Sequence, residues 1–211
     1  MSQEVGLSKR QQKALQTRLN LLNAGKAIFL KEGFQKATMT EINKRAKTGY
    51  GTAYVYFKNK DELFAELMEN IVDKMHGVAN LPFEPETNEE AYIQIKSQVR
   101  LFIQAALDEQ DMMKIVKEAV GVSEIVAKKW SQIRARFIAG IIRDITYVQK
   151  SGIASRNIEA SLIARGWYYM NEQLMWDIVF GEVAEDLAIV AENLALLYTS
   201  GLYIAGNFQE S

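Results

Sequence analysis

Apolar residues recur at helical spacing along almost the whole chain, and the alternation typical of strands is nearly absent. Clean apolar stripes run over residues 92–106 and 126–148, and glycines interrupt the periodicity between several stretches. The pattern predicts helices over residues 8–32, 38–46, 50–57, 61–78, 92–106, 112–117, 123–151, 157–180 and 185–205. The expected fold class is therefore all-α.

Residues 38–60 read as two short helices joined by a tight turn. Thr38 with Glu41 fits a capping box at the start of the first helix, and Gly49 and Gly51 end its periodicity. In the second helix the spacing predicts a core-facing side formed by Ala53, Tyr54 and Phe57 and an opposite side formed by Tyr50, Thr52, Val55 and Tyr56. A pair of short helices joined in this way can place one of them in a DNA groove.

Charge supports the same interpretation. Residues 1–60 contain twelve Lys or Arg and three acidic residues, a formal charge of +9, whereas the whole chain carries only −1. The near-neutral total therefore conceals a basic N-terminal part and an acidic remainder. Such a division is typical of a nucleic-acid-binding end joined to a second part with another task.

Residues 79–88 form the one convincing linker, because both prolines, Pro82 and Pro85, lie there next to polar and acidic residues. We therefore expect two domains. The first spans residues 1–78, with a helix-turn-helix over about 8–66 and a connecting helix, and the second spans residues 85–211.

The N-terminal motif resembles that of the TetR family of transcriptional regulators. The features that carry the resemblance are Thr38 to Thr40, Ile42, Gly51, Thr52, Tyr54, Tyr56, Phe57 and Lys60. The resemblance covers about residues 15–70. It implies a three-helix DNA-binding head and a helical C-terminal domain that binds an effector and dimerises.

Two residues depart from the family pattern at the turn: Lys47 stands where Gly is common, and Thr48 stands where a small apolar residue is usual. A Lys held at positive φ is disfavoured by about 1 kcal/mol. We therefore expect Gly49, and not Lys47, to adopt the left-handed conformation.

The DNA-binding residues follow from the motif. The groove-facing set comprises Thr48, Gly49, Tyr50, Thr52 and Tyr54, and the phosphate-binding set comprises Thr38, Tyr56 and Lys60. For Tyr54 a half-buried core position is the alternative.

The C-terminal part is expected to hold the effector pocket. The candidate residues are aromatic or apolar with one amide: Phe102, Trp130, Phe137, Trp167, Tyr168, Met170, Asn171 and Trp176. The alternative for each is an ordinary core position. The pocket hypothesis depends mainly on the family resemblance and favours a small lipophilic or aromatic effector.

The last two helices, 157–180 and 185–205, carry more apolar surface than one domain needs, which favours a homodimer held together there, with Leu194 and Gly201 in the interface. The predicted function is a ligand-released repressor on a palindromic operator. The alternatives are an activator and a constitutive DNA-binding regulator without a pocket.

An enzyme is not expected. The chain has no Cys and a single His, His76, which is best interpreted as a helix-end residue, and it has no phosphate loop or metal-ligand motif. We expect no cofactor and no metal. Neither a signal pattern nor an apolar run of membrane-spanning length is present, so a cytoplasmic location without membrane partners is expected.

Overall fold

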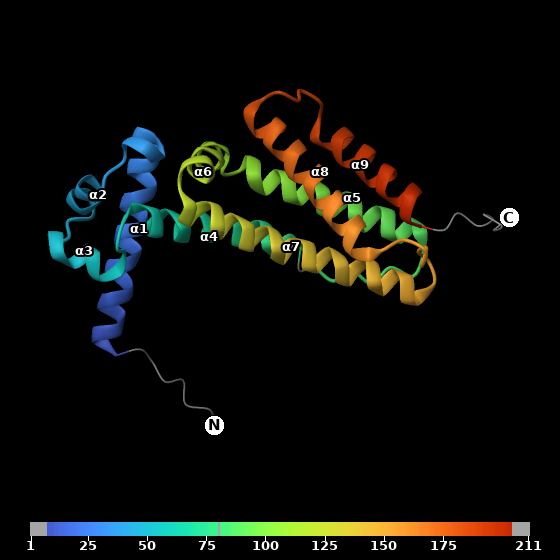
Figure 1. Ribbon diagram of the computed structural model, residues 1–211, viewed down its shortest axis with the longest axis horizontal. Coiled ribbons are helices and arrows are strands. Elements are labelled where there is room, and N and C mark those ends of the chain that lie inside the picture. Colours follow the sequence, from blue (N-terminus) through green and yellow to red (C-terminus); the bar gives the residue numbers. More distant parts are fainter. Residues whose placement is uncertain (1–7, 80, 204–211) are drawn as a thin grey trace. The chain divides into compact units, whose positions relative to one another are not determined.

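The computed structural model describes residues 8–79 and 81–203, without the side chains of Tyr50, Lys74, His76, Val78 and Ala79. Within these ranges the regular elements are helices (Figure 1), with one isolated bridge between Ala154 and Tyr203. The helices are α1 (Lys9–Lys36), α2 (Met39–Ala46), α3 (Tyr50–Tyr56), α4 (Lys60–Ala79), α5 (Asn88–Leu107), α6 (Gln110–Val122), α7 (Glu124–Ser151), α8 (Ala160–Phe180) and α9 (Leu187–Leu202). The all-α prediction is confirmed.

The chain divides into two compact units. The first unit, called the head below, comprises residues up to Asn70 together with Lys114–Trp130, and the second comprises Ile71–Met113 together with the residues from Ser131 onward. Helices α4, α6 and α7 each supply residues to both units. The stretch Lys114–Trp130 thus groups with the N-terminal helices, although the sequence placed it in the C-terminal domain. The division into domains 1–78 and 85–211 stays a prediction.

Three phenylalanine rings form the centre of the head. Phe64 of α4 meets Phe29 and Phe34 of α1 edge to face, with ring centroids 4.8 and 5.0 Å apart. Each such pair contributes about 0.5–1.5 kcal/mol beyond the burial of its area. Gly33 interrupts α1 with φ 77°, as the sequence predicts, although helical structure resumes as far as Lys36.

The turn between α2 and α3 differs from the expectation. The capping box of Thr38 and Glu41 is confirmed, since each side chain accepts a hydrogen bond from the other's backbone N–H. Lys47, however, ends α2 in the left-handed conformation with φ 54°, while Gly49 has an ordinary φ of −62°. The expectation that Gly49 takes the strained position was therefore wrong. The N–H of Lys47 lies 3.3 Å from the carbonyl oxygen of Lys44, so the turn is closed by the αL cap that Gly usually provides.

In the second unit, α5 packs against α8 and α9. The predicted stops at Gly152 and Gly181 are confirmed by their positive φ values of 85° and 78°. The described α8 begins three residues later than predicted and α9 begins at Leu187, while the predicted end of the last helix, Ala205, lies outside the described residues. None of the described helices is both long and apolar enough to cross a bilayer.

Candidate nucleic-acid interface and ligand cavity

Helix α3 is held to the head by its inner side. Ala53 and Phe57 are almost completely buried. The guanidinium of Arg18 lies 4.7 Å from the centre of the Phe57 ring and also forms an ion pair with Glu66 of α4, in which Nε is 2.8 Å from Oε1. A planar cation that both stacks on a ring and pairs with a carboxylate fixes the position of that ring. The orientation of α3 is therefore determined by α1 and α4 together.

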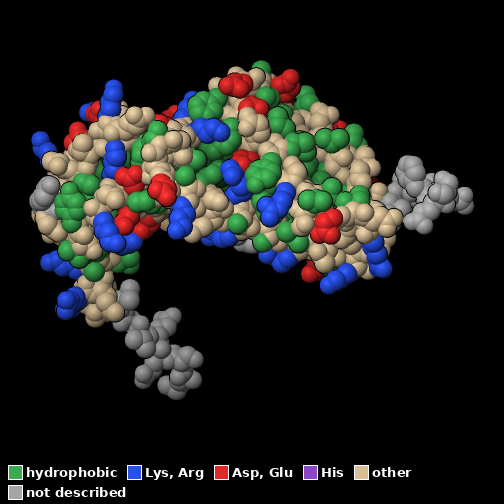
Figure 2. Space-filling view, in the orientation of Figure 1, with side chains coloured by type: hydrophobic (Ala, Val, Ile, Leu, Met, Phe, Trp, Pro, Cys, Tyr) green, Lys and Arg blue, Asp and Glu red, His purple; other side chains and the backbone are tan. Residues whose placement is uncertain are grey.

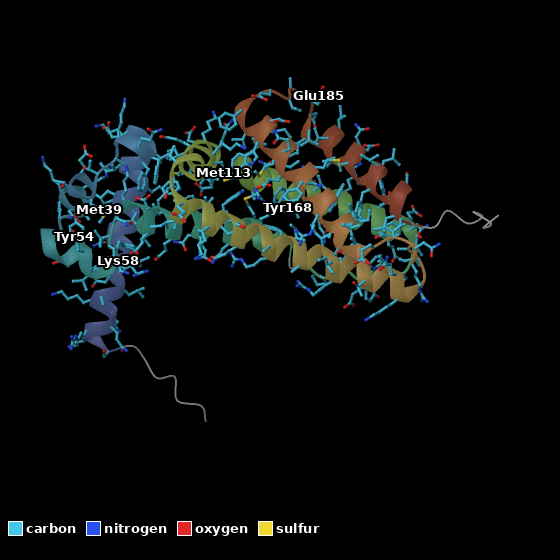
Figure 3. The ribbon with its side chains drawn as sticks, viewed as in Figure 1. Met39, Tyr54, Lys58, Met113, Tyr168 and Glu185 are labelled. Carbon is cyan, nitrogen blue, oxygen red and sulfur yellow. The ribbon has the colours of Figure 1, made fainter. Side chains whose placement is uncertain are left out.

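The outer side of α3 is uncovered within the head. Thr52 is exposed, Tyr54 is 40% exposed (Figure 3), and Val55 is 81% exposed. An apolar side chain so exposed on a short, well-anchored helix is suited to contact with another molecule. The sequence had placed Val55 on this side but did not include it among the DNA-binding residues. Its position opposite the buried Ala53 was the available signal.

The other predicted contact residues are less uniform. Gly49 is exposed, while Tyr56 and Thr48 are partly covered. The hydroxyl oxygen of Thr48 is buried and lacks a hydrogen-bond partner among the described residues. The side chain of Tyr50 lies outside the described residues, so its predicted role in base recognition is not placed.

Two residues predicted to bind phosphate donate hydrogen bonds to other groups within the head. The hydroxyl of Thr38 donates to Oε2 of Glu41 at 2.7 Å, as part of the capping box. The ammonium of Lys60 donates to the carbonyl oxygens of Phe34, Gln35 and Ala37 at 2.8, 2.8 and 3.0 Å. An ammonium has three hydrogens to donate. Lys60 therefore holds the end of α1 in this structure, in place of the phosphate contact expected from the sequence.

Glu118 of α6 accepts hydrogen bonds from backbone N–H groups at the same end of α1. The N–H groups of Phe34 and Gln35 each donate to one oxygen of this carboxylate at 3.2 Å. A Cβ on Gly33 would lie 3.4 Å from Oε2 of Glu118, and the positive φ would strain any other residue there. We call Glu118, Lys60 and the backbone of residues 34–37 the α1 clamp. Sequence reasoning missed it because Glu118 lies 84 residues after Phe34 in the chain.

The second unit contains a cavity bordered by α5, α7 and α8, with an empty volume of about 570 Å³ out to its open mouth. Its walls include predicted ligand-binding residues, namely Phe102, Phe137, Trp167, Tyr168 and Asn171. Trp130 belongs to the head and Trp176 is buried, and neither is among the lining residues. Met170 lines a different surface, described next.

Sequence reasoning also missed two polar residues of the cavity wall, Gln98 and Asp144. Asp144 lies three residues after Ile141 and four before Val148, so it falls on the same helical stripe. An acidic residue within an apolar stripe was the available signal. Burial raises the pKa of Asp144 to about 6, and the nearby charge of Arg143 offsets only part of that effect.

An open apolar groove runs between α8 and α9, lined among others by Leu162, Met170, Leu197 and Gly201. Leu162 and Leu197 are 67% and 62% exposed. Leu194, predicted to lie in a dimer interface, is instead only 5% exposed because it packs inside its own protomer. Gly201 is exposed, and a Cβ added there would meet no atom within 4 Å.

Comparison with known proteins supports the motif. Residues 21–67, from the middle of α1 into α4, match the family model of bacterial regulatory proteins, tetR family. The HTH-type transcriptional regulator UidR of Escherichia coli is 27% identical over 187 residues, 88% of this chain and 87% of UidR. These two findings support a TetR-family transcriptional regulator.

Two further likenesses differ in how much of the chain they cover. The HTH-type transcriptional repressor NicS of Pseudomonas putida is 39% identical over a shorter stretch of 62 residues, 29% of each chain. The structure of Salmonella enterica GusR superposes with a TM-score of 0.66 over 92% of this chain and 95% of GusR, at 16% identity. At that identity the superposition shows that the fold is shared over nearly the whole length.

The matches support a transcriptional regulator with a helix-turn-helix DNA-binding head, and TetR-family regulators are DNA-binding transcription factors and not enzymes. Lys and Arg side chains lie over the face of the head that is turned to the viewer in Figure 2, interspersed with acidic and apolar ones. Lys44, Arg45, Lys47 and Lys58 are exposed around α2 and α3. The TetR-family head thus combines an uncovered helix with flanking cations, the combination that positions a reading helix on phosphates.

Proposed function

We propose that the chain is a dimeric repressor that binds a near-palindromic operator and is released from it by a small-molecule effector. The outer side of α3 carries the proposal, because Thr52, Tyr54 and Val55 are exposed there and exposed cations flank the helix. Thr and Tyr hydroxyls suit hydrogen bonds to base edges, and Val55 suits a thymine methyl group. Gly49, at the start of the helix, completes the proposed reading surface, with Tyr56 beside the phosphates, whereas the buried hydroxyl of Thr48 does not take part.

The cavity of the second unit supports the effector part of the proposal. Protein interiors otherwise pack to high density, and a constitutive regulator does not need an open cavity because it binds no ligand. Apolar walls with a few polar groups are typical of small-molecule sites. The cavity therefore favours a sensor over a constitutive DNA-binding regulator.

The groove between α8 and α9 supports the dimer. Large apolar side chains on these helices are exposed: Leu162, Phe180, Ile189, Leu196 and Leu197. A contiguous apolar surface of this kind on a soluble chain usually marks an interface. A second copy of the same face is the occupant that fits, since a two-fold axis makes such a patch self-complementary. It would also supply the second head that a palindromic operator needs.

The α1 clamp supports a route from effector to head. Helix α6 begins with residues of the second unit and ends with residues of the head, including Glu118. A shift of α6 would alter the hydrogen bonds of the Phe34 and Gln35 amides directly. By linkage, the effector must bind the non-DNA state more tightly, with a coupling in the ordinary range of about 1–3 kcal/mol.

The decisive experiment selects duplexes from a randomised pool and measures their binding by fluorescence anisotropy across a salt series. Binding should involve two protomers per site and weaken steeply with salt, because several phosphates release counterions. Thr52→Ala should reduce discrimination between sites by about 1–3 kcal/mol, whereas Lys47→Gln should weaken all sites alike and lower the salt slope by about one. Arg165→Gln makes the same charge change at an exposed position on α8. It is the control and should change neither the discrimination between sites nor the salt slope.

A flat salt response, or one protomer per selected site, would contradict the proposal. The sign of regulation is checked separately, by placing the selected site across a promoter in a reporter strain. A repressor lowers reporter expression, whereas higher expression would identify an activator.

A further inference from the structure

The cavity of the second unit carries one formal charge on its wall. Asp144, from α7, lines it together with the rings of Phe137, Trp167 and Tyr168. Among the lining residues that the structure describes, Asp144 alone is charged at neutral pH. A carboxylate on a wall of rings and aliphatic side chains opposes folding unless something pairs with it.

The carboxylate lacks such a partner in residues 8–79 and 81–203, where it forms neither a hydrogen bond nor an ion pair. Arg143 precedes it on α7 and is exposed, while α5 presents the uncharged Gln98. Asp144 interacts electrostatically with the phenols of Tyr198, on α9, and Tyr203. Burial is the main cause that raises the pKa of both phenols, and the charge of Asp144 raises it further. Both are therefore neutral at physiological pH. The charge of Asp144, which is partly exposed, is therefore offset only in part, by Arg143.

The neighbouring polar groups are uncharged and include acceptors. One Nδ2 hydrogen of Asn171 is donated to the carbonyl oxygen of Trp167 at 2.8 Å, and its Oδ1 can accept on the α8 side. Tyr168, also on α8, is neutral because burial raises the pKa of its phenol. The Asp144 carboxylate, the one formal charge among the described lining residues, therefore favours a ligand that both donates hydrogen bonds and carries a positive charge.

Three ligand classes can be compared on this basis. An anion would meet an unpaired negative charge. A neutral lipophile would fill the apolar space but leave the carboxylate desolvated and without a partner. A protonated amine provides the missing charge and up to three donors, and aromatic walls attract the cation as well.

We propose that the effector is a primary or secondary ammonium ion on a compact apolar or aromatic body, with its ammonium group at the Asp144 carboxylate. The inference rests on the proposed function, since it names the chemistry of the effector in that same cavity. It narrows the lipophilic or aromatic effector expected from the sequence to a cationic one. Asp144 is the residue that sets this specificity.

The experiment uses matched pairs of probes that differ only in charge: benzylammonium and benzyl alcohol, 1-naphthylmethylammonium and 1-naphthalenemethanol, hexylammonium and hexanol. Binding to the full chain is measured by titration calorimetry at about pH 7.5. For at least one pair the ammonium should bind at least about tenfold more tightly than its alcohol. Because the Asp144 carboxyl must be ionised, this preference should fall by about tenfold between pH 7.5 and pH 5.

Two variants test the assignment to one residue. Asp144→Asn keeps the shape of the side chain and should abolish both the preference and its pH dependence, with alcohol binding unchanged or tighter. Asp177→Asn is the matched control, because Asp177 lies on α8 and its carboxylate accepts from Gln173 instead of lining the cavity. Asp177→Asn should retain both features. The pH profile of the parent chain tests the proposal even if Asp144→Asn fails to fold.

Equal or tighter binding of the alcohols, binding of no ammonium probe at millimolar concentration, or a preference that survives in Asp144→Asn would overturn the proposal. Operator binding, measured in the same preparations, separates it from the proposed function. If ammonium probes bind through Asp144 but leave a bound operator in place, the cation site stands and the effector mechanism fails. If no duplex is bound under any condition, the regulator itself is refuted whatever the probes do.

Discussion

The end of α1 in the head and the cavity wall of the second unit differ in how their polar side chains are paired. In the head, Glu118 and Lys60 bind backbone groups at the end of α1, Thr38 and Glu41 cap the start of α2, and Arg18 pairs with Glu66 next to α3. In the second unit the carboxylate of Asp144 has no hydrogen-bond or ion-pair partner among the described residues. The comparison teaches that a short reading helix needs a rigid frame, whereas a sensor must leave something unsatisfied for its ligand.

The two units also differ in apolar surface. Val55 is the most exposed large apolar side chain of α3, and it stands on a helix that is otherwise polar or aromatic on its outer side. Exposed apolar residues on α8 and α9, including Leu162 and Leu197, instead border a shared groove. The first pattern suits contact with a polar duplex and the second suits contact with another protein surface.

The largest effect is expected at that groove. Leu197→Asp would place a charge in an apolar interface twice, once from each protomer, and should raise the dimer dissociation constant by at least about a hundredfold. Sedimentation equilibrium at micromolar concentration measures it. Ile93→Asp, an equally exposed apolar position on α5 at 57%, is the control and should remain dimeric. An unchanged dimer in Leu197→Asp would show that another surface holds the protomers. Leu194→Asp is unsuitable, because its buried position would confound dissociation with unfolding.

The second prediction concerns the α1 clamp. Glu118→Gln removes the charge and one acceptor oxygen that receive the amides of Phe34 and Gln35, and it should weaken operator binding by about 1–2 kcal/mol. Hydrogen exchange at those two amides should accelerate correspondingly. Lys114→Gln, an exposed change on the same helix, should alter neither measurement. Protection that persists in Glu118→Gln would mean that the clamp is not what orders this segment.

The third prediction tests the partly offset charge of Asp144 without any ligand. The pKa of Asp144 is raised to about 6 by burial, so the folded chain favours the protonated form, and this group loses its stabilising contribution as pH rises from about 4 through 6. Asp144→Asn should therefore be more stable than the parent at pH 8 by about 1 kcal/mol, after discounting for solvent screening, and nearly equal to it at pH 4. Urea unfolding at the two pH values measures the difference. A constant difference would mean that Asp144 is paired or solvated.

The smallest effect is expected at the turn. Lys47 occupies the left-handed region at φ 54°, so Lys47→Gly should relieve strain and stabilise the head by up to about 1 kcal/mol. The same change removes an exposed cation and should weaken operator binding. Lys47→Gln keeps the strain and removes only the charge, so thermal unfolding should distinguish the two variants while their DNA affinities fall alike. A Gly variant no more stable than the Gln variant would show that the turn is not strained.

Local signals in the sequence were sufficient for much of the fold. Capping residues, glycine stops and apolar periodicity act over a few neighbouring residues, and for that reason they predicted α2, the breaks at Gly33, Gly152 and Gly181, and the buried side of α3 at Ala53 and Phe57. The family-like order of residues from Thr38 to Lys60 also predicted the TetR assignment. These features depend on the chain's own neighbours and can be read without the fold.

Tertiary structure decided the rest, because it depends on residues that are distant in the chain. Only packing shows that the ammonium of Lys60 donates to backbone carbonyl oxygens within residues 34–37 and that Glu118 accepts from N–H groups of the same segment. It also shows that Lys47 adopts a left-handed conformation that its own propensity disfavours. Only packing also shows which stripe residues border a void, so that Asp144 becomes part of a cavity wall while Leu194 becomes core. Helical periodicity fixes the face on which a residue lies, but what that face meets is determined by long-range packing.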